Sequence, residues 1–366
     1  MTGIPFHKYT HCGNSFIIVD ELSQFHLPEI EKPLFAKQAS DVNFGIGADG
    51  LLFIQPFSSE TLGRINDTFG YWDKLPLLRS CDYIFRLFEP NMKEALACGN
   101  GLLCIMSYLH EHYGIEKTSI MTEIPLSEPN NIVIKINRKT NLYCCNLGPP
   151  RCLPKQIVST SGVEHYKEQV DLVCNLKIKF RSHDLHSFTE DTPLILSGYM
   201  TFTGEPHLVF FPDECMPLEL SGALFISSGG SNQIEKRINF GSWLVNHIGS
   251  YINRHYQNHF PAGINVNFAR IQKSTNTIQY RTYERGVDRE TLACGTGAAA
   301  VAHIARVLKM INDSDVVIMS PCLCVRHEPE AKLLVAEREN SILLNGYPSF
   351  LLSGQFNYKN TKEWVA

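Results

Sequence analysis

Two stretches of the chain carry helix-like apolar patterns, and each begins at a cysteine followed by Gly-x-Gly. The first runs from Cys98 to about residue 113, with Gly114 as a typical C-terminal stop. The second runs from Cys294 to about residue 312, is apolar nearly all round, and has Arg306 and Lys309 in its last turns to complement the helix dipole. A helix that is apolar on every face is buried on every face, so we expect each to run through the middle of a curled sheet.

Alternating and aromatic runs predict strands before both helices, at residues 83–88 and 278–283. Each run leads into an Arg-x-aromatic-Glu pattern, and further upstream a turn of glycine and a polar residue precedes an apolar run. The matching segments are Arg86, Phe88 and Glu89 with Arg281, Tyr283 and Glu284, and Gly13-Asn14 before residues 16–19 with Gly204-Glu205 before residues 208–211. Because the order of elements repeats, the sequence predicts two similar domains related by a pseudo-twofold axis.

The remaining segments predict the domain limits and the peripheral parts. We place a hinge at residues 137–140, where polar residues separate two strand-like runs, and the domains at residues 1–138 with 352–366 and at 139–351. Two irregular stretches, near 56–78 and 174–193, have the composition of surface insertions. A helix around residues 234–256 is expected to pack at the periphery, because its apolar residues lie on one face.

Composition narrows the class of protein. With 366 residues, 44% of them hydrophobic, the chain can bury a large core. A net charge of -4 and a pI near 6.4 give no electrostatic case for nucleic acid or an anionic membrane as partner. The N-terminus lacks the pattern of a secretory signal, and no apolar run is long enough to span a bilayer. We therefore expect a cytoplasmic protein.

The chain has twelve cysteines but no C-x-x-C pair. Without a secretion signal a disulfide framework is not expected. Cys144-Cys145 and Cys322-Leu323-Cys324 are spaced too closely for the usual zinc sites, so we predict no metal and take most other cysteines as small buried hydrophobes.

The chemistry is concentrated in an octapeptide pattern that occurs twice, at residues 94–101 and 290–297. It places Cys98 and Cys294 at helix starts, where unpaired backbone N–H groups and the positive end of the helix dipole converge. Such surroundings lower the pKa of a thiol and favour thiolate. One copy would be read as a buried structural thiol, whereas two copies, each after a strand that ends in Glu, favour a pair of acid/base groups acting on one substrate carbon.

Residues 45–50 match the letters of a dinucleotide-binding fingerprint, Gly-x-Gly-x-x-Gly. They precede a strand-like run instead of following a strand and opening a helix, so we interpret them as a turn.

Taken in order, these motifs resemble the diaminopimelate epimerase family of cofactor-independent amino-acid epimerases. They are residues 6–16, residues 45–49, Cys98-Gly99-Asn100-Gly101, Pro206-His207, Glu284-Arg285-Gly286 and Cys294-Gly295-Thr296-Gly297. The resemblance implies an α+β fold of two pseudo-symmetric domains, each a curved, barrel-like sheet wrapped around a central apolar helix, with the active site in the cleft between them. It implies a small amino-acid substrate and no cofactor, and leaves a homodimer open.

By this resemblance Cys98 and Cys294 are the catalytic residues, one as thiolate and one as thiol. Backbone N–H groups at both helix starts hold the α-carboxylate, and His207 and Glu284 are candidates to poise the thiols or to bind the α-amino group; His207 is equally readable as a structural histidine. The substrate-binding candidates together are Asn14, Glu89, Gly99, Asn100, Glu205, His207, Asn265, Glu284, Arg285, Gly295 and Thr296.

The chain departs from the family pattern where the distal end of diaminopimelate is held, mainly by asparagines and one arginine. The matching positions here are Glu89, Glu205, Asn265 and Arg285, and a family glutamine is replaced by Gly50. Two carboxylates repel a substrate carboxylate, and Arg285 neutralises one of them. We expect a substrate with a cationic distal end, such as histidine, lysine, ornithine or another diamino acid. The alternative is diaminopimelate itself, with Glu89 or Glu205 binding its distal ammonium.

Three further classes of protein fit the sequence less well than an amino-acid epimerase with two catalytic cysteines. Isomerases of the same fold that use a single carboxylate lack the cysteine pair that is present here, and proline-racemase-like enzymes resemble Cys-Gly-His where this chain has Cys98-Gly99-Asn100. A non-catalytic amino-acid-binding protein would need neither thiol. Oxidation of Cys98 and Cys294 to a disulfide is expected as a side reaction.

Overall fold

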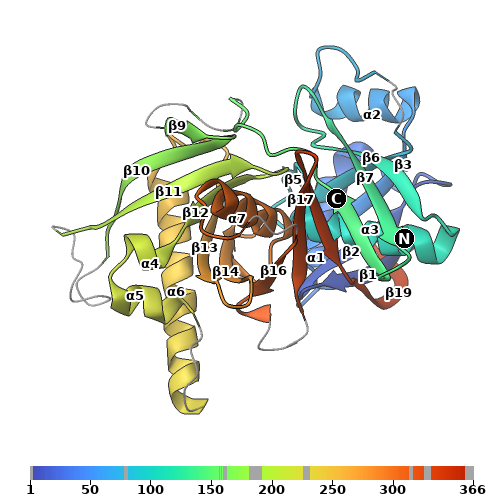
Figure 1. The fold of residues 1–366 in the computed structure, drawn as a ribbon. Helices are drawn as coiled ribbons and strands as arrows, with labels where there is room; N and C mark the ends of the chain where they lie inside the picture. The colour runs from blue at the N-terminus through green and yellow to red at the C-terminus, as the bar shows by residue number, and fades with distance from the viewer. Residues whose placement is uncertain are drawn as a thin grey trace. The chain divides into compact units, whose positions relative to one another are not determined.

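The computed structural model describes residues 3–77, 81–155, 157, 159, 163–180, 192–225, 231–312, 316–324 and 331–358. The chain divides into two compact units (Figure 1). Unit 1 comprises Met1–Asn146 and Asn345–Ala366, and unit 2 comprises Leu147–Leu344.

Unit 1 is built from strands around one long helix, with two further helices and a short 3-10 turn. Its elements are β1 (Gly3–His11), β2 (Asn14–Asp20), η1 (Glu29–Glu31), α1 (Lys32–Ser40), β3 (Gly50–Pro56), α2 (Ser59–Phe69), β4 (Tyr83–Phe88), β5 (Glu94–Ala95), α3 (Gly99–Tyr113), β6 (Lys117–Thr122), β7 (Asn130–Asn137), β8 (Leu142–Asn146) and β19 (Ser349–Asn357).

Unit 2 has the same plan, with one long peripheral helix, α6, of 25 residues. Its elements are β9 (Val163–Lys167), β10 (Val170–Ile178), β11 (Leu194–Phe202), β12 (Pro206–Phe210), α4 (Pro212–Cys215), α5 (Leu218–Leu224), α6 (Ser231–His255), β13 (Asn265–Gln272), β14 (Thr277–Glu284), β15 (Arg289–Thr291), α7 (Gly295–Val307), β16 (Val316–Pro321), β17 (Leu333–Arg338) and β18 (Ser341–Gly346).

The strand pairings repeat from one unit to the other. In unit 1, β2 runs parallel to β3, β3 antiparallel to β4, β4 antiparallel to β5 and parallel to β6, and β6 antiparallel to β7. In unit 2, β12, β13, β14, β15, β16 and β17 pair in the same order and with the same directions. The duplication read from the sequence is therefore a duplication of sheet topology.

The two apolar helices lie inside these sheets. Helix α3 packs against β1, β2, β7 and β8, while α7 packs against β11 to β14, β16 and β17 (Figure 1). Every residue of α7 is buried except Arg306, as expected for a helix enclosed by one curved sheet. The predicted fold, a curved sheet around a central apolar helix in each unit, is confirmed.

Some details differ from the sequence-based expectation. Helix α7 ends at Val307 rather than near residue 312, because Lys309 has a left-handed backbone with φ of 58°. The segment predicted as a surface insertion near 56–78 contains α2, which begins at the Ser58 cap and ends at Gly70 in the left-handed conformation. The apolar face of α2 is buried. Ser, Asp and Gly residues, which favour loops, hide the helical periodicity of this segment in the sequence.

The expected hinge at residues 137–140 is a tight turn inside one unit. The N–H groups of Thr140 and Asn141 both donate to the Asn137 carbonyl, and β8 pairs with β7 across this turn. Strand β19 likewise pairs along its length with β1. The compact units therefore end at Asn146 and Leu344, where the sequence suggested residues 138 and 351.

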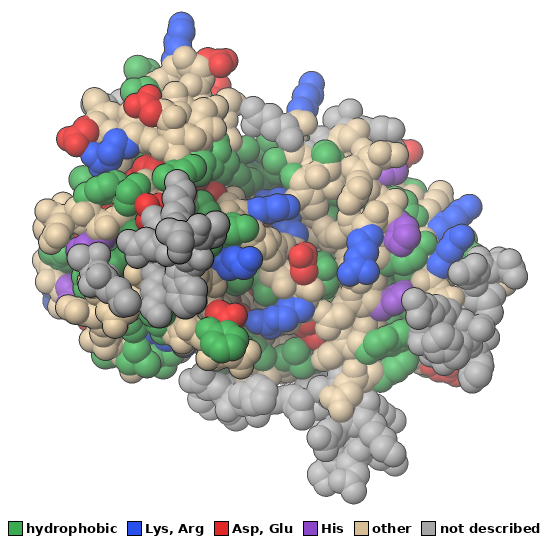
Figure 2. All heavy atoms as spheres, turned by 180° about the vertical axis from the view of Figure 1, so that it is seen from behind, with side chains coloured by type: hydrophobic (Ala, Val, Ile, Leu, Met, Phe, Trp, Pro, Cys, Tyr) green, Lys and Arg blue, Asp and Glu red, His purple; other side chains and the backbone are tan. Residues whose placement is uncertain are grey.

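The second predicted insertion, 174–193, begins inside β10, and its residues 181–191 lie outside the described part of the chain. Helix α6 confirms the predicted helix at 234–256. Within the described residues, no helix combines the length and the apolar character that crossing a bilayer requires. Figure 2 shows basic and acidic side chains together on one face of the molecule.

Candidate active site

The first half-site lies in unit 1 at the start of α3. Cys98 has an extended backbone and caps this helix, and its Sγ accepts a hydrogen bond from the Gly101 N–H at 3.3 Å. The Cys98 side chain is half-buried. The sulfur thus lies among first-turn amides that have no acceptor within the helix, an arrangement that favours negative charge on sulfur.

A buried amide network supports this helix start. Asn100 Nδ2 donates to Asn14 Oδ1 at 2.8 Å, and Asn100 Oδ1 lies 2.9 Å from His11 Nδ1. An amide oxygen only accepts, so His11 carries its proton on Nδ1. Burial lowers the pKa of His11 to about 4, although the hydrogen bond that His11 donates to Asn100 acts in the opposite direction, and the imidazole is neutral at pH 7. Two predicted residues, Asn14 and Asn100, are therefore in direct contact.

The second half-site lies in unit 2 at the start of α7. Cys294 caps the helix as Cys98 does, and its Sγ accepts from the Gly297 N–H at 3.3 Å. The Thr296 hydroxyl lies 3.5 Å from the same sulfur, and the Tyr280 hydroxyl donates to the Cys294 carbonyl at 3.2 Å. Cys294 is buried, so its sulfur is held by donors in a site with little water.

Thr296 connects Cys294 to a buried histidine. His207 Nε2 lies 3.0 Å from Thr296 Oγ1, and His207 Nδ1 lies 3.1 Å from the amide nitrogen of Asn267. Thr282 in turn donates to Asn267 Oδ1 at 2.9 Å. An amide nitrogen only donates, so His207 Nδ1 accepts and Nε2 carries the proton toward Thr296.

His207 is a neutral donor in this arrangement. Burial, together with the nearby Arg285 charge, lowers its pKa to about 3. The neutral ring can orient the Thr296 hydroxyl toward the sulfur, and it lies one side chain removed from Cys294.

The predicted distal residues of unit 2 form a second cluster. Arg285 Nη2 and Nε lie 2.5 and 3.2 Å from Glu205 Oε2, and Arg285 Nη1 donates to the Ala262 carbonyl at 2.7 Å. The Asn265 side chain accepts from the Arg285 backbone N–H at 2.9 Å. Arg285 is therefore paired with a carboxylate of its own chain.

Glu89 and Glu284 stand at matching strand ends. The Glu284 carboxylate accepts from the Thr291 hydroxyl. Glu89 closes the β4–β5 turn through its backbone, since its N–H donates to the Lys93 carbonyl at 2.9 Å. Its side chain is half-buried.

The site prediction missed several buried polar residues. His11, Asn267, Thr282 and Tyr280 contact predicted residues or their neighbours and carry no local signal beyond being polar residues within apolar runs. The ion pairs Arg86–Glu94 and Arg281–Glu290 were also missed as partners, although both members lie within the repeated pattern. Repetition of the same residue at the same place in both copies is the signal that identifies them.

All twelve cysteines are free thiols. Among the described residues, the ligand atoms of Cys152, His165 and Asp171 lie within 4.8 Å of one another. Hydrogen bonds account for this exposed group, because His165 Nδ1 lies 3.2 Å from Asp171 and Cys152 donates to Gln169 Oε1 at 2.8 Å.

Solved structures place this fold among racemases and epimerases. The chain is similar to a hydroxyproline epimerase from Agrobacterium vitis, with a TM-score of 0.57 and 11% identity over 96% of this chain and 92% of that one. It is also similar to a probable proline racemase from Agrobacterium radiobacter K84, with a TM-score of 0.59 and 12% identity over 100% and 98% of the two chains. At this identity the likeness concerns the fold.

Sequence relatives define the family. The profile of the diaminopimelate epimerase family matches residues 6–153 and 247–321. The diaminopimelate epimerase from Methanocella arvoryzae is 30% identical to this chain, over 87% of each sequence. The diaminopimelate epimerase from Archaeoglobus fulgidus is 29% identical, over 83% of this chain and 82% of its own sequence. The chain belongs to the diaminopimelate epimerase family, and it is an isomerase of the epimerase and racemase class.

Proposed function

We propose that this protein inverts the Cα centre of an amino acid with a cationic distal end, by proton transfer between two cysteines. The observation that carries the reaction type is the repeated cap: Cys98 and Cys294 each begin an enclosed helix and each accept an N–H from the residue three positions on. No pyridoxal group is needed if the helix starts stabilise the carbanion.

An α-amino-acid carbanion has little stabilisation of its own, and aimed dipoles supply it. Gly99, Asn100, Gly295 and Thr296 stand in the first turns of α3 and α7. Backbone N–H groups in a first helical turn point out of the N-terminal end of the helix. We assign them to the substrate α-carboxylate, onto which charge spreads as the Cα–H bond breaks.

In the proton transfer, the thiolate of one cysteine takes the Cα proton and the thiol of the other donates its proton to the opposite face. The product is the inverted amino acid, and the two sulfurs have exchanged protonation states. Exchange with water restores them before the same direction runs again. The neutral His207 donates to Thr296, which frees the Thr296 hydroxyl proton for the Cys294 thiolate.

The pairing of Arg285 supports the proposed substrate class. Its three guanidinium nitrogens are engaged by Glu205 and the Ala262 carbonyl. A distal carboxylate of a substrate would have to displace Glu205, which is itself buried. A distal ammonium, imidazole or second amino group meets no such competition and gains from the Glu205 and Glu89 carboxylates.

The names of the sequence relatives favour a second candidate, diaminopimelate itself. In that case Glu89 or Glu205 binds the distal ammonium, and the distal carboxylate is held elsewhere. This reaction would serve lysine biosynthesis. A homodimeric state and a cytoplasmic location remain predictions from the sequence.

The test is deuterium incorporation at Cα from heavy water, measured for histidine, lysine, ornithine, and LL- and meso-diaminopimelate. We expect exchange of at least one of the first three to exceed that of diaminopimelate about tenfold or more. Glu205→Asn, which frees Arg285, should shift the ratio toward diaminopimelate. Efficient exchange of diaminopimelate alone would reject the cationic-end proposal and leave the two-cysteine reaction in place.

A further inference from the structure

The same ion pair occurs in both units at the same place relative to the cysteine. In unit 1, Arg86 Nε and Nη2 donate to the two carboxylate oxygens of Glu94 at 2.7 and 2.6 Å. In unit 2, Arg281 Nε and Nη2 donate to the two oxygens of Glu290 at 2.5 and 2.8 Å. Glu94 and Glu290 each stand four residues before the cysteine. The pair is two-pronged in each unit, which fixes direction as well as distance.

Each pair joins the two strands of the hairpin that delivers the cysteine. Arg86 lies on β4 beside Leu87, which pairs with Ala95 on β5, and Arg281 lies on β14 beside Thr282, which pairs with Thr291 on β15. All four charged side chains are at most 2% exposed. Two residues separate Ala95 from Cys98, so any shift of β5 moves the cap directly.

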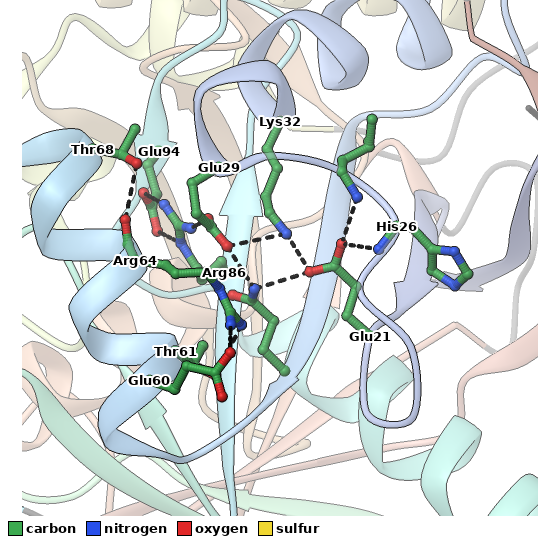
Figure 3. Close-up of polar contacts among 12 residues, drawn as sticks. Glu21, His26, Glu29, Lys32, Glu60, Thr61, Arg64, Thr68, Arg86 and Glu94 are labelled. Carbon is green, nitrogen blue, oxygen red and sulfur yellow. Dashed lines mark hydrogen bonds and ion pairs between the residues drawn. The ribbon is translucent and has the colours of Figure 1, made fainter.

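The surroundings of the two pairs differ. Figure 3 shows Arg86 between Glu94 and Glu29, with Lys32 bridging Glu29 and Glu21. Arg281 instead donates to neutral groups, the Leu224 carbonyl at 2.9 Å and the Ser242 hydroxyl at 2.7 Å. What the two units share is thus the Arg–Glu pair itself.

We propose that Arg86–Glu94 and Arg281–Glu290 are positioning pairs, each of which holds its own cysteine in the geometry that lets the sulfur accept a first-turn N–H. This rests on the proposed two-cysteine reaction. Neither pair touches the sulfur; each acts through the four-residue segment that ends in the cap. A bent segment would lengthen the 3.3 Å contact between Sγ and the Gly101 or Gly297 N–H and destabilise the thiolate.

The experiment measures each cysteine separately in the full chain. Glu94→Gln and Glu290→Gln remove one charge with little change of shape. Iodoacetamide alkylation rates of Cys98 and Cys294 are followed by peptide mass spectrometry at pH 7, well below the unfolding temperature. We expect Glu94→Gln to slow Cys98 about tenfold while Cys294 stays within about twofold, and Glu290→Gln to do the reverse.

The other cysteine is the internal control in each variant, and Glu337→Gln is a control for loss of an ion pair away from the caps. If a Gln variant fails to fold, Arg86→Lys or Arg281→Lys keeps the charge but loses the two-pronged contact. Unchanged rates at both cysteines, slowing of both together, or faster alkylation of the cysteine beside the lost pair would overturn the proposal and make the pairs purely structural. Alkylation needs no substrate, so a wrong proposed function would leave this result unaffected.

Discussion

The two half-sites share a backbone and differ in the side chains beneath it. A Cβ added at Gly101, after Cys98, would meet Leu52 and Phe85 at 3.4 Å. A Cβ added at Gly297, after Cys294, would meet Asn267 Oδ1 at 2.6 Å. Apolar side chains therefore lie next to Gly101, whereas the Asn267 amide lies next to Gly297.

The two helix starts also differ in the polar residue that follows Cys-Gly. Thr296 lies 3.5 Å from Cys294, and its counterpart Asn100 turns its amide to His11 and Asn14. A substrate with an ammonium on one side of Cα and a side chain on another is itself asymmetric. In the proposed reaction, this difference in surroundings would fit the two thiols to different faces of the substrate.

The largest effect is expected from removing either thiol. Cys98→Ala and Cys294→Ala should each lower racemisation about a thousandfold, because a positioned acid/base group contributes that much. Each variant keeps one base, so each should exchange the Cα proton of one enantiomer only, and the two variants should select opposite enantiomers. Chiral analysis of deuterated products measures this.

Replacing the exposed Cys152 or Cys174 by Ala is the matched control and should leave both rates unchanged. If both active-site variants retained full racemisation, the two cysteines would have no catalytic role. Binding of an amino acid without any Cα exchange, in the natural protein as in the variants, would make a binding protein the better description.

A smaller effect is expected on the free energy of unfolding when the two buried ion pairs are broken one at a time. Glu290→Gln leaves Arg281 buried beside neutral partners and should cost about 3–5 kcal/mol in the free energy of unfolding. Glu94→Gln leaves Arg86 paired with Glu29 and should cost about 1–3 kcal/mol. Urea denaturation of both variants measures the difference.

Glu116→Gln provides the reference, because its exposed pair with Arg138 is worth about 1 kcal/mol or less. If Glu94→Gln and Glu290→Gln lowered the free energy of unfolding equally, Glu29 would not stabilise the Arg86 charge once Glu94 is lost. The contacts of the charge cluster in Figure 3 would then not explain the stability of unit 1.

The smallest effect, counted per pH unit, is the pH dependence of stability. His11 and His207 are neutral when folded, with pKa values lowered by burial to about 4 and about 3 from 6.5. Below pH 6.5 the unfolded chain binds protons that the folded chain does not, so stability is full above pH 6.5 and falls on acidification. Each histidine contributes about 1.4 kcal/mol per pH unit to this slope.

His11→Asn should reduce that slope between pH 6.5 and about 4. His207→Asn should reduce the slope over a wider range, from pH 6.5 to about 3. The free energy of unfolding at fixed ionic strength from pH 8 to 3.5 measures both slopes, whatever the absolute cost of each substitution. Unchanged slopes would mean that the two imidazoles are already charged in the folded protein.

Much of the fold could be predicted because its signals are local. The strands at 83–88 and 278–283 and the caps at Cys98 and Cys294 each depend on a few consecutive residues. Helix α2 and the end of α7 were not predicted correctly, since polar residues hid the apolar face of the first and a single left-handed Lys309 ended the second.

By itself the sequence determined that one supersecondary unit occurs twice, that each copy ends in a thiol at a helix start, and which family the chain resembles. Tertiary structure decided what those groups touch. His11 meets Asn100 across 89 residues, His207 meets Asn267 across 60, and Arg285 meets Glu205 across 80. A buried polar group must find a partner, and which partner it finds depends on how strands distant in sequence come together, which no short pattern encodes.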